Sequence, residues 1–190
     1  IIPFGVNLGD KFFYDGEISP EEIFEYADNN KTLPKTNAVN EEAFKEHFAK
    51  ILNDYDAIIH FDISSDMSSA YQNAVNASKN FKNVYVVDSR TLSTAISLEA
   101  IYAKKLTETM DDPAKIIELV KKRIPAVQAS FVIERLDYLY KGGRCSGLAL
   151  LGANLLKIRP EIEVLNGNMK NTEKFRGKMA DCVTKYCRAT

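Results

Sequence analysis

The stretch over residues 57–87 reads Ala-Ile-Ile-His-Phe-Asp-Ile at 57–63, then a serine-rich turn, a helical pattern over Ala70–Asn80, and Val-Tyr-Val-Val at 84–87. Each apolar run is short and nearly continuous, which is typical of a strand buried on both faces. Helical patterns follow over Leu92–Met110 and from Asp112-Pro113 to about Arg123. This alternation predicts an α/β fold with a mostly parallel sheet covered by helices.

The segment before this stretch predicts two short strands and two helices. Ile2–Leu8 and Lys11–Tyr14 alternate as strands. Ser19 begins a capping box, Ser-Pro-Glu-Glu, which predicts a helix to about residue 29. We expect a loop over Lys31–Asn40, after which Asn40 caps the next helix.

The pattern changes after Pro125 and predicts the beginning of a second, α+β domain. Strands are predicted over Ala126–Val132 and Ile158–Leu165, with a turn at Gly167-Asn168. Helices are predicted around 136–140, over Leu148–Leu156 and over Thr172–Cys187. We therefore expect one domain over residues 1–124 and a partial second domain over 125–190, with two or three strands.

Composition excludes several classes of protein. The net charge of −1 in 190 residues, with both signs mixed, gives no electrostatic case for nucleic acid as a partner. No apolar run reaches the roughly 18–20 residues that span a bilayer, so any membrane contact is expected to be transient. The three cysteines lack CxxC spacing, which predicts no zinc site and favours a reducing cytoplasm.

Three polar segments are candidates for a binding site. Ile63–Ser69 follows a predicted strand and offers four hydroxyls at a helix start, which favours an anionic oxygen ligand, although one serine is needed as the helix cap. Asp88–Thr94 follows the next strand and suits either a site or an ordinary turn. Lys141–Arg144, Lys-Gly-Gly-Arg, combines two permissive glycines with a guanidinium suited to carboxylate or phosphate.

An enzymatic alternative stays open at this point. No GxSxG elbow, phosphate loop, GxGxxG or HExxH occurs in the chain, and His47 and His60 are more consistent with structural roles than with metal ligation. A small hydrolase or phosphotransferase could still use Ser68 or Ser65 as nucleophile and Arg144 as an anion clamp.

Taken in order along the chain, these pieces resemble the DegV family of bacterial lipid-binding proteins. The matching motifs span nearly all 190 residues: Leu33-Pro34-Lys35-Thr36, Ile63-Ser64-Ser65-x-Met67-Ser68 with Tyr71-Gln72-Asn73-Ala74, Val86-Val87-Asp88-Ser89, Leu136–Arg144, Leu155–Pro160 and Asn166-Gly167. The resemblance implies a two-domain α/β protein that holds one long-chain fatty acid, such as palmitate, stearate or oleate, in a tunnel between its domains.

The same resemblance implies a carrier and no catalytic residue, cofactor or metal. Family members present the acyl carboxylate to a separate ATP-dependent fatty acid kinase, which makes an acyl phosphate for phospholipid synthesis in the cytoplasm. By position, Thr36 and Ser68 correspond to the residues that hydrogen-bond the carboxylate, with Ser65 as a weaker candidate. Arg144 matches an arginine linked to phosphoryl or kinase interaction.

The chain departs from the family pattern at several loops. Asn37-Ala38-Val39 replaces Ser-Gln-Pro, Ser69-Ala70 replaces Gly-Thr, and the glycines usual after the Asp-Ser turn are replaced around Ala95 and Ser97. The family's N-terminal Asp-Ser-Thr strand and C-terminal portion have no counterpart in this sequence, so we expect a chain that is incomplete at both ends.

Overall fold

The computed structural model describes residues 1–134, 137–146 and 158–189. The chain forms two compact units, an N-terminal unit over Ile1–Asp88 and a C-terminal unit over Ser89–Thr190. Helices and strands alternate through the chain, so the predicted α/β class is confirmed. The strands were predicted to be mostly parallel, but most of the described strand pairs are antiparallel, because neighbouring strands are joined by hairpins or pair with distant segments. The domain boundary predicted near residue 124 stays a prediction, because it concerns which parts of the chain fold independently.

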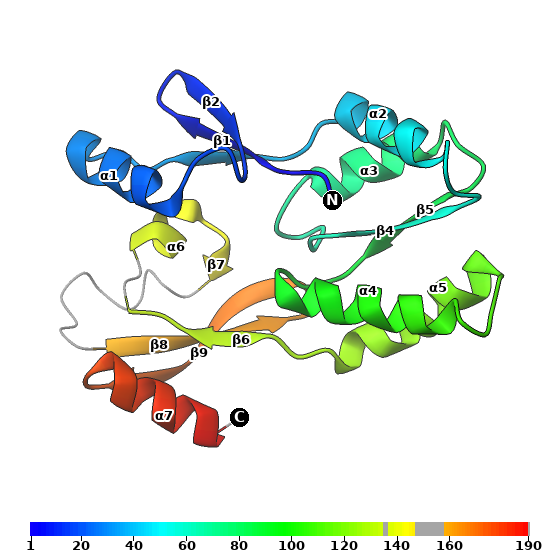
Figure 1. Cartoon of the computed structure of the whole chain (residues 1–190). Helices are drawn as coiled ribbons and strands as arrows, with labels where there is room; N and C mark the ends of the chain where they lie inside the picture. The colour runs from blue at the N-terminus through cyan, green and yellow to red at the C-terminus, as the bar shows by residue number, and fades with distance from the viewer. Residues whose placement is uncertain (135–136, 147–157, 190) are drawn as a thin grey trace. The chain divides into compact units, whose positions relative to one another are not determined.

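The N-terminal unit contains two sheets and three helices among its described elements (Figure 1). In chain order these are β1 (Gly5–Leu8), β2 (Lys11–Tyr14), α1 (Pro20–Asn30), β3 (Lys35–Asn37), α2 (Glu41–Ile51), β4 (Ile58–Asp62), α3 (Ala70–Ser78) and β5 (Val84–Asp88).

The first sheet has the order β2-β1-β3 and is antiparallel throughout. The capping box at Ser19 is confirmed: its side chain accepts from the Glu22 amide, while the Glu22 carboxylate accepts from the Ser19 amide. The loop predicted over residues 31–40 is wrong at β3. Those three residues become a strand because they pair with β1, in a register that sets Thr36 opposite Val6, and no local pattern announces this distant pairing.

The second sheet is the parallel pair β4–β5, joined by the crossover helix α3. Helices α2 and α3 pack side by side (Figure 1). Small and aromatic residues of the two helices pack with both strands in one core. Ala74 is fully buried, and its small side chain leaves room for Phe44 and Phe48. The members of this core are Val39, Phe44, Phe48, Ile58, Ala70, Ala74, Ala77 and Val84.

The C-terminal unit begins with a helical hairpin and continues into a mixed sheet. Its described elements are α4 (Thr94–Leu106), α5 (Pro113–Arg123), a 3₁₀ turn (Ile124–Ala126), β6 (Ser130–Val132), α6 (Asp137–Gly142), β7 (Cys145–Ser146), β8 (Ile158–Leu165), β9 (Asn168–Arg176) and α7 (Met179–Ala189).

Among the described residues, this sheet has the order β6-β8-β9-β7, with only the β7–β9 pair parallel. These four described strands are more than the two or three predicted. The strand predicted from residue 126 begins only at Ser130, after the 3₁₀ turn. The helix predicted over Leu148–Leu156 lies outside the described residues.

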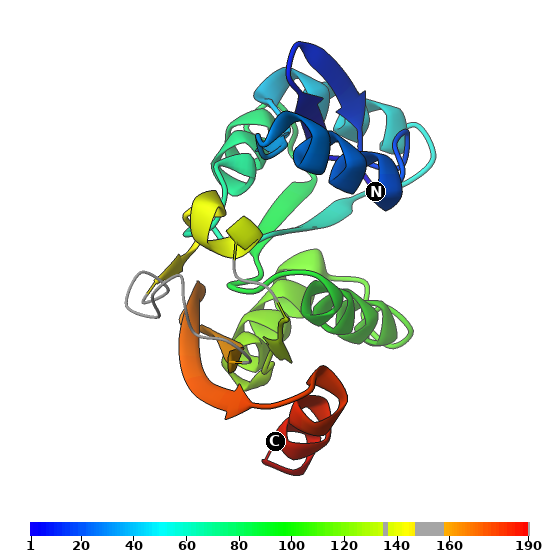
Figure 2. The same ribbon diagram turned by 90° about the vertical axis from the view of Figure 1, so that its left-hand side faces the viewer.

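The helix predicted over Thr172–Cys187 is wrong for its first five residues, which belong to β9. They follow a tight hairpin in which Asn166 and Gly167 both have positive φ, 52° and 84°, one residue earlier than the predicted turn. The hairpin sets Leu165 opposite Asn168, and the polar strand β9 pairs with β8 from there. Helix α7 starts at Met179, follows β9 and contacts this sheet (Figure 2).

Ser93, just before α4, has a backbone conformation that a side chain disfavours. Its φ is 57° and its ψ is −135°, and its hydroxyl makes no capping bond. Such conformations cost about 1–3 kcal/mol in residues other than glycine. We expect Ser93→Gly to raise the free energy of unfolding by about 1 kcal/mol, measured by urea denaturation. Ser97→Gly, inside α4, is the control and should lower that free energy by about 0.5–1 kcal/mol; a loss in both variants would contradict the assignment of strain.

Candidate functional site

The serine-rich turn lies where sequence reasoning placed it, between the carboxyl end of β4 and helix α3. The carbonyl of fully buried Ser64 accepts from the amides of Met67 at 2.9 Å and Ser68 at 3.2 Å. The Ser64 hydroxyl accepts from the Asp66 amide at 3.3 Å. Met67 is buried, so the turn is anchored in the core at its centre.

Ser68, and not the helix N-cap residue Ser69, supplies the side-chain cap of α3. The Ser68 Oγ accepts from the Ala70 amide at 3.1 Å, whereas Ser69 makes no side-chain capping bond. The hydroxyl oxygen of Ser68 is thus oriented towards the helix, and its O–H can donate to a ligand. Ser68 is half-buried, which lowers the competition from water for that donor.

Ser65 is already engaged with a carboxylate of the protein itself. Its Oγ donates to Asp88 Oδ2 at 2.6 Å, and its amide donates to Asp88 Oδ1 at 3.2 Å. A serine hydroxyl has one proton to donate, so contact with a ligand carboxylate would require the bond to Asp88 to open. The predicted ligand contact of Ser65 stays a prediction.

Thr36 lies at the centre of β3 with an exposed side chain. In the described part of the chain, no hydrogen bond occupies its hydroxyl. As a β-branched residue it suits a strand, and its Oγ1 remains a donor and acceptor for a ligand.

Two contacts join the chain segments that carry Thr36 and Ser68. The Asn73 side chain of α3 donates to the carbonyl of Val39 at 2.8 Å, and Val39 shares a core with Ala70. Val39 lies three residues after Thr36, and Ala70 two residues after Ser68. The N-terminal unit therefore ties the two segments together, while the meeting of both hydroxyls at one ligand stays a prediction.

A cavity of about 400 Å³ adjoins the end of β3 in the same unit. Apolar side chains of Ile2, Phe12 and Val39 line it together with His47 and Lys50. Burial, followed by the positive charges nearby, lowers the pKa of His47, so this imidazole is neutral over a wider pH range than a free one.

Arg144 is exposed in the C-terminal unit, between α6 and β7. Its guanidinium folds back to donate to the carbonyl of Gly142. Gly143, between them, has a φ of 70°, a conformation that glycine adopts without strain. The Gly-Gly pair thus closes a tight turn that presents the arginine at the surface.

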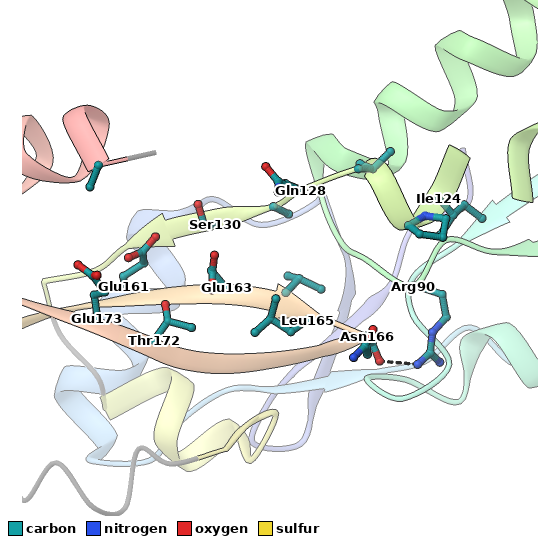
Figure 3. A pocket seen from close by; sticks show the side chains of 16 residues that line it. Arg90, Ile124, Gln128, Ser130, Glu161, Glu163, Leu165, Asn166, Thr172 and Glu173 are labelled. Carbon is teal, nitrogen blue, oxygen red and sulfur yellow. Dashed lines mark hydrogen bonds between the residues drawn. The ribbon is translucent and has the colours of Figure 1, made fainter. Parts of the chain in front are cut away.

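A larger cavity, of about 780 Å³, lies within the C-terminal unit and was not foreseen from the sequence (Figure 3). Arg90, from the loop after β5, reaches across one end of it to the carbonyl of Asn166. Glu161, Glu163 and Glu173 lie on its wall. Burial, together with the charges of the other two glutamates, raises the pKa of Glu161. This polar, acidic wall is unsuited to a fatty-acid carboxylate.

The two histidines sit in structural surroundings. The His60 ring packs edge-on against Phe44 and Phe48, with centroids 5.3 and 5.4 Å apart, and its Nε2 lies 3.3 Å from Asp62. Among residues 1–134, 137–146 and 158–189, no group of three or more His, Cys, Asp or Glu side chains could hold a metal ion. In the same ranges, no helix combines the length and apolar character needed to cross a membrane.

Comparison with known proteins places this geometry in a family. A curated protein of Clostridium acetobutylicum named as DegV domain-containing is 31% identical over 96% of this chain and 69% of its own length. A fatty acid-binding protein of Thermotoga maritima is 36% identical over 85% of this chain and 58% of its own length. The chain thus spans 58–69% of the length of these two relatives.

Solved structures agree with the sequence relatives. A DegV lipid binding protein from Thermotoga maritima matches all of this chain and 69% of its own, with a TM-score of 0.81 and 32% identity. A fatty-acid-binding DegV family protein from Thermus thermophilus matches 99% of this chain and 69% of its own, with a TM-score of 0.84 and 26% identity. A family model described as "Uncharacterised protein, DegV family" matches residues 1–183. With this match running through both compact units, the chain belongs to the DegV family.

Proposed function

We propose that this chain binds one long-chain fatty acid, with the carboxylate held by the hydroxyls of Thr36 and Ser68. The observation that carries the proposal is the hydrogen bond at Ser68. The Ser68 Oγ accepts from the Ala70 amide, which leaves the Ser68 O–H to donate to a ligand. Relatives named as fatty acid-binding or lipid binding support the class of ligand.

Neutral hydroxyls suit this task for a physical reason. A buried carboxylate without partners is costly, whereas two or three hydrogen bonds make its burial tolerable. Each methylene removed from water contributes about 0.8 kcal/mol, so a C16–C18 tail supplies about 10 kcal/mol before ordering costs. The tail therefore provides affinity, while the hydroxyls orient the head group without an ion pair that would compete with a phosphoryl donor.

We further propose that the protein is a carrier in the cytoplasm that presents the carboxylate to a separate fatty acid kinase for phospholipid synthesis. Arg144 is exposed and cationic, which suits it to a phosphate or to an acidic surface of the partner. Cys145, Cys182 and Cys187 form no disulfide within the described part of the chain, which is consistent with a reducing compartment.

Mass spectrometry tests the proposal against a serine enzyme. After incubation with palmitate, the native spectrum should show one added palmitate per chain, and denaturation should remove it. A palmitoyl or phosphoryl group that stays on Ser65 or Ser68 after denaturation would support the enzyme instead. A native spectrum without palmitate would contradict the proposal.

Arg144→Ala should separate binding from transfer. We expect an unchanged dissociation constant for palmitate and a fall of about tenfold or more in acyl phosphate formation with a fatty acid kinase subunit and ATP, because a charge-assisted contact is lost. Lys141→Ala, a nearby cation in the last turn of α6, is the control and should retain transfer. Loss of palmitate binding in Arg144→Ala would instead assign Arg144 to the ligand.

A further inference from the structure

We infer that Asp88 is a positioning residue for the carboxylate site, because it clamps the turn that carries Ser68. The inference rests on the proposed function and deepens it: Thr36 and Ser68 are the proposed ligand donors, and Asp88 sets the orientation of one of them without touching the ligand.

The clamp follows from the parallel pairing of β4 and β5. Their register sets Asp62 beside Asp88, so both strands end at the same edge of the sheet. From there the Asp88 carboxylate reaches the turn after β4 and accepts two hydrogen bonds from Ser65, at 3.2 Å from the amide and 2.6 Å from the hydroxyl. The shorter distance falls in the range of hydroxyl–carboxylate bonds, which are among the strong hydrogen bonds of proteins.

Ser65 and Ser68 belong to one hydrogen-bonded turn. The amides of Met67 and Ser68 donate to the carbonyl of Ser64, so the backbone from Ser64 to Ser68 forms one hydrogen-bonded unit. Buried Met67 anchors the middle of this piece, and Asp88 anchors its beginning. Releasing Ser65 from Asp88 removes the anchor at the beginning of the turn, and the Ser68 hydroxyl loses its direction.

Asp88 acts on the site through Ser65 and not by contact with the ligand. A second carboxylate beside Asp88 would be repelled, so Asp88 is unsuited to direct ligand contact. Asp88 also accepts from the Ser65 amide, an N–H group of the turn before α3. Burial and then the charge of Asp88 raise the pKa of Tyr71 in the first turn of α3.

The test measures the dissociation constant for palmitate by equilibrium dialysis, with the melting temperature recorded for every variant. Asp88→Asn should weaken binding by about tenfold or more, since a charged hydrogen-bond acceptor is lost. Ser65→Ala should weaken palmitate binding less, because the hydrogen bond from the backbone amide of residue 65 to Asp88 remains. The double variant should bind within about twofold of Asp88→Asn, since both changes break one linkage. Ser65→Thr, which keeps the hydroxyl, should bind like the unmodified chain.

Asp112→Asn is the matched control. Asp112 also accepts two amide hydrogen bonds, from Ala114 and Lys115, but it caps α5 in the C-terminal unit. It should lower the melting temperature and leave palmitate binding unchanged. Binding by Asp88→Asn equal to that of the unmodified chain would overturn the inference. If Asp88→Asn does not fold, equal binding by Ser65→Ala and Ser65→Thr would overturn it. An unmodified chain that does not bind palmitate would refute the proposed function itself.

Discussion

Replacing Thr36 with valine and Ser68 with alanine together should abolish most palmitate binding. Each hydroxyl is expected to donate to the ligand carboxylate, and a hydrogen bond to a charged group contributes about 1.5–3 kcal/mol. Losing both should raise the dissociation constant by about a hundredfold or more. Apolar burial of the tail should leave weak residual binding, measurable by equilibrium dialysis.

A neighbouring pair of residues provides the control for this double variant. Thr32→Val with Ser69→Ala makes the same chemical changes four residues before Thr36 and one residue after Ser68. The Thr32 hydroxyl donates to the carbonyl of Asn30, and Ser69 makes no side-chain capping bond. This control should bind palmitate like the unmodified chain. Ser68→Ala also removes the acceptor of the Ala70 amide, which should lower the free energy of unfolding by about 0.5–2 kcal/mol. Unchanged binding in the test variant would refute the head-group assignment.

Phe48→Ala should cause the largest loss of stability in the N-terminal unit. Phe48 is fully buried, and its ring meets those of Phe44, His60 and Phe81 at centroid distances of 5.7, 5.4 and 6.2 Å. Truncating a buried phenylalanine costs about 3–5 kcal/mol, from lost burial and the cavity that remains. Urea denaturation should show this as a much lower midpoint.

Phe24→Ala is the control for the core substitution. Phe24 lies on α1 and is 54% exposed, so its removal should change the free energy of unfolding by less than about 1 kcal/mol. A comparable loss in both variants would contradict the position of the core between α2, α3, β4 and β5.

The sequence predicted those parts of the fold that depend on local signals. Asn40 and Asp112 cap the helices that they were expected to begin, each through its side-chain oxygen. The strands β4 and β5 were evident from their continuous apolar residues, although most of their side chains are only partly buried. By contrast, β3 and β9 depend on strand pairing with distant or polar segments, and β9 exposes most of its side chains. Helical spacing within 172–187 therefore misled the prediction.

The candidate site, too, was predictable from the sequence only where local signals determine it. A hydroxyl-rich turn at Ser68 could be predicted, since it follows a buried strand and precedes a helix. The bond between Ser65 and Asp88 could not, because the two residues are 23 positions apart and meet only through the parallel register of β4 and β5. The contact of Arg90 with the β8–β9 turn is likewise tertiary.

A structure of this chain with palmitate bound is the most direct test of the central claim. Both carboxylate oxygens should lie within hydrogen-bonding distance of the hydroxyls of Thr36 and Ser68, at roughly 2.5–3.0 Å. Asp88 should keep its bonds to Ser65 in that complex. A carboxylate bound elsewhere, with neither hydroxyl in contact, would contradict the account.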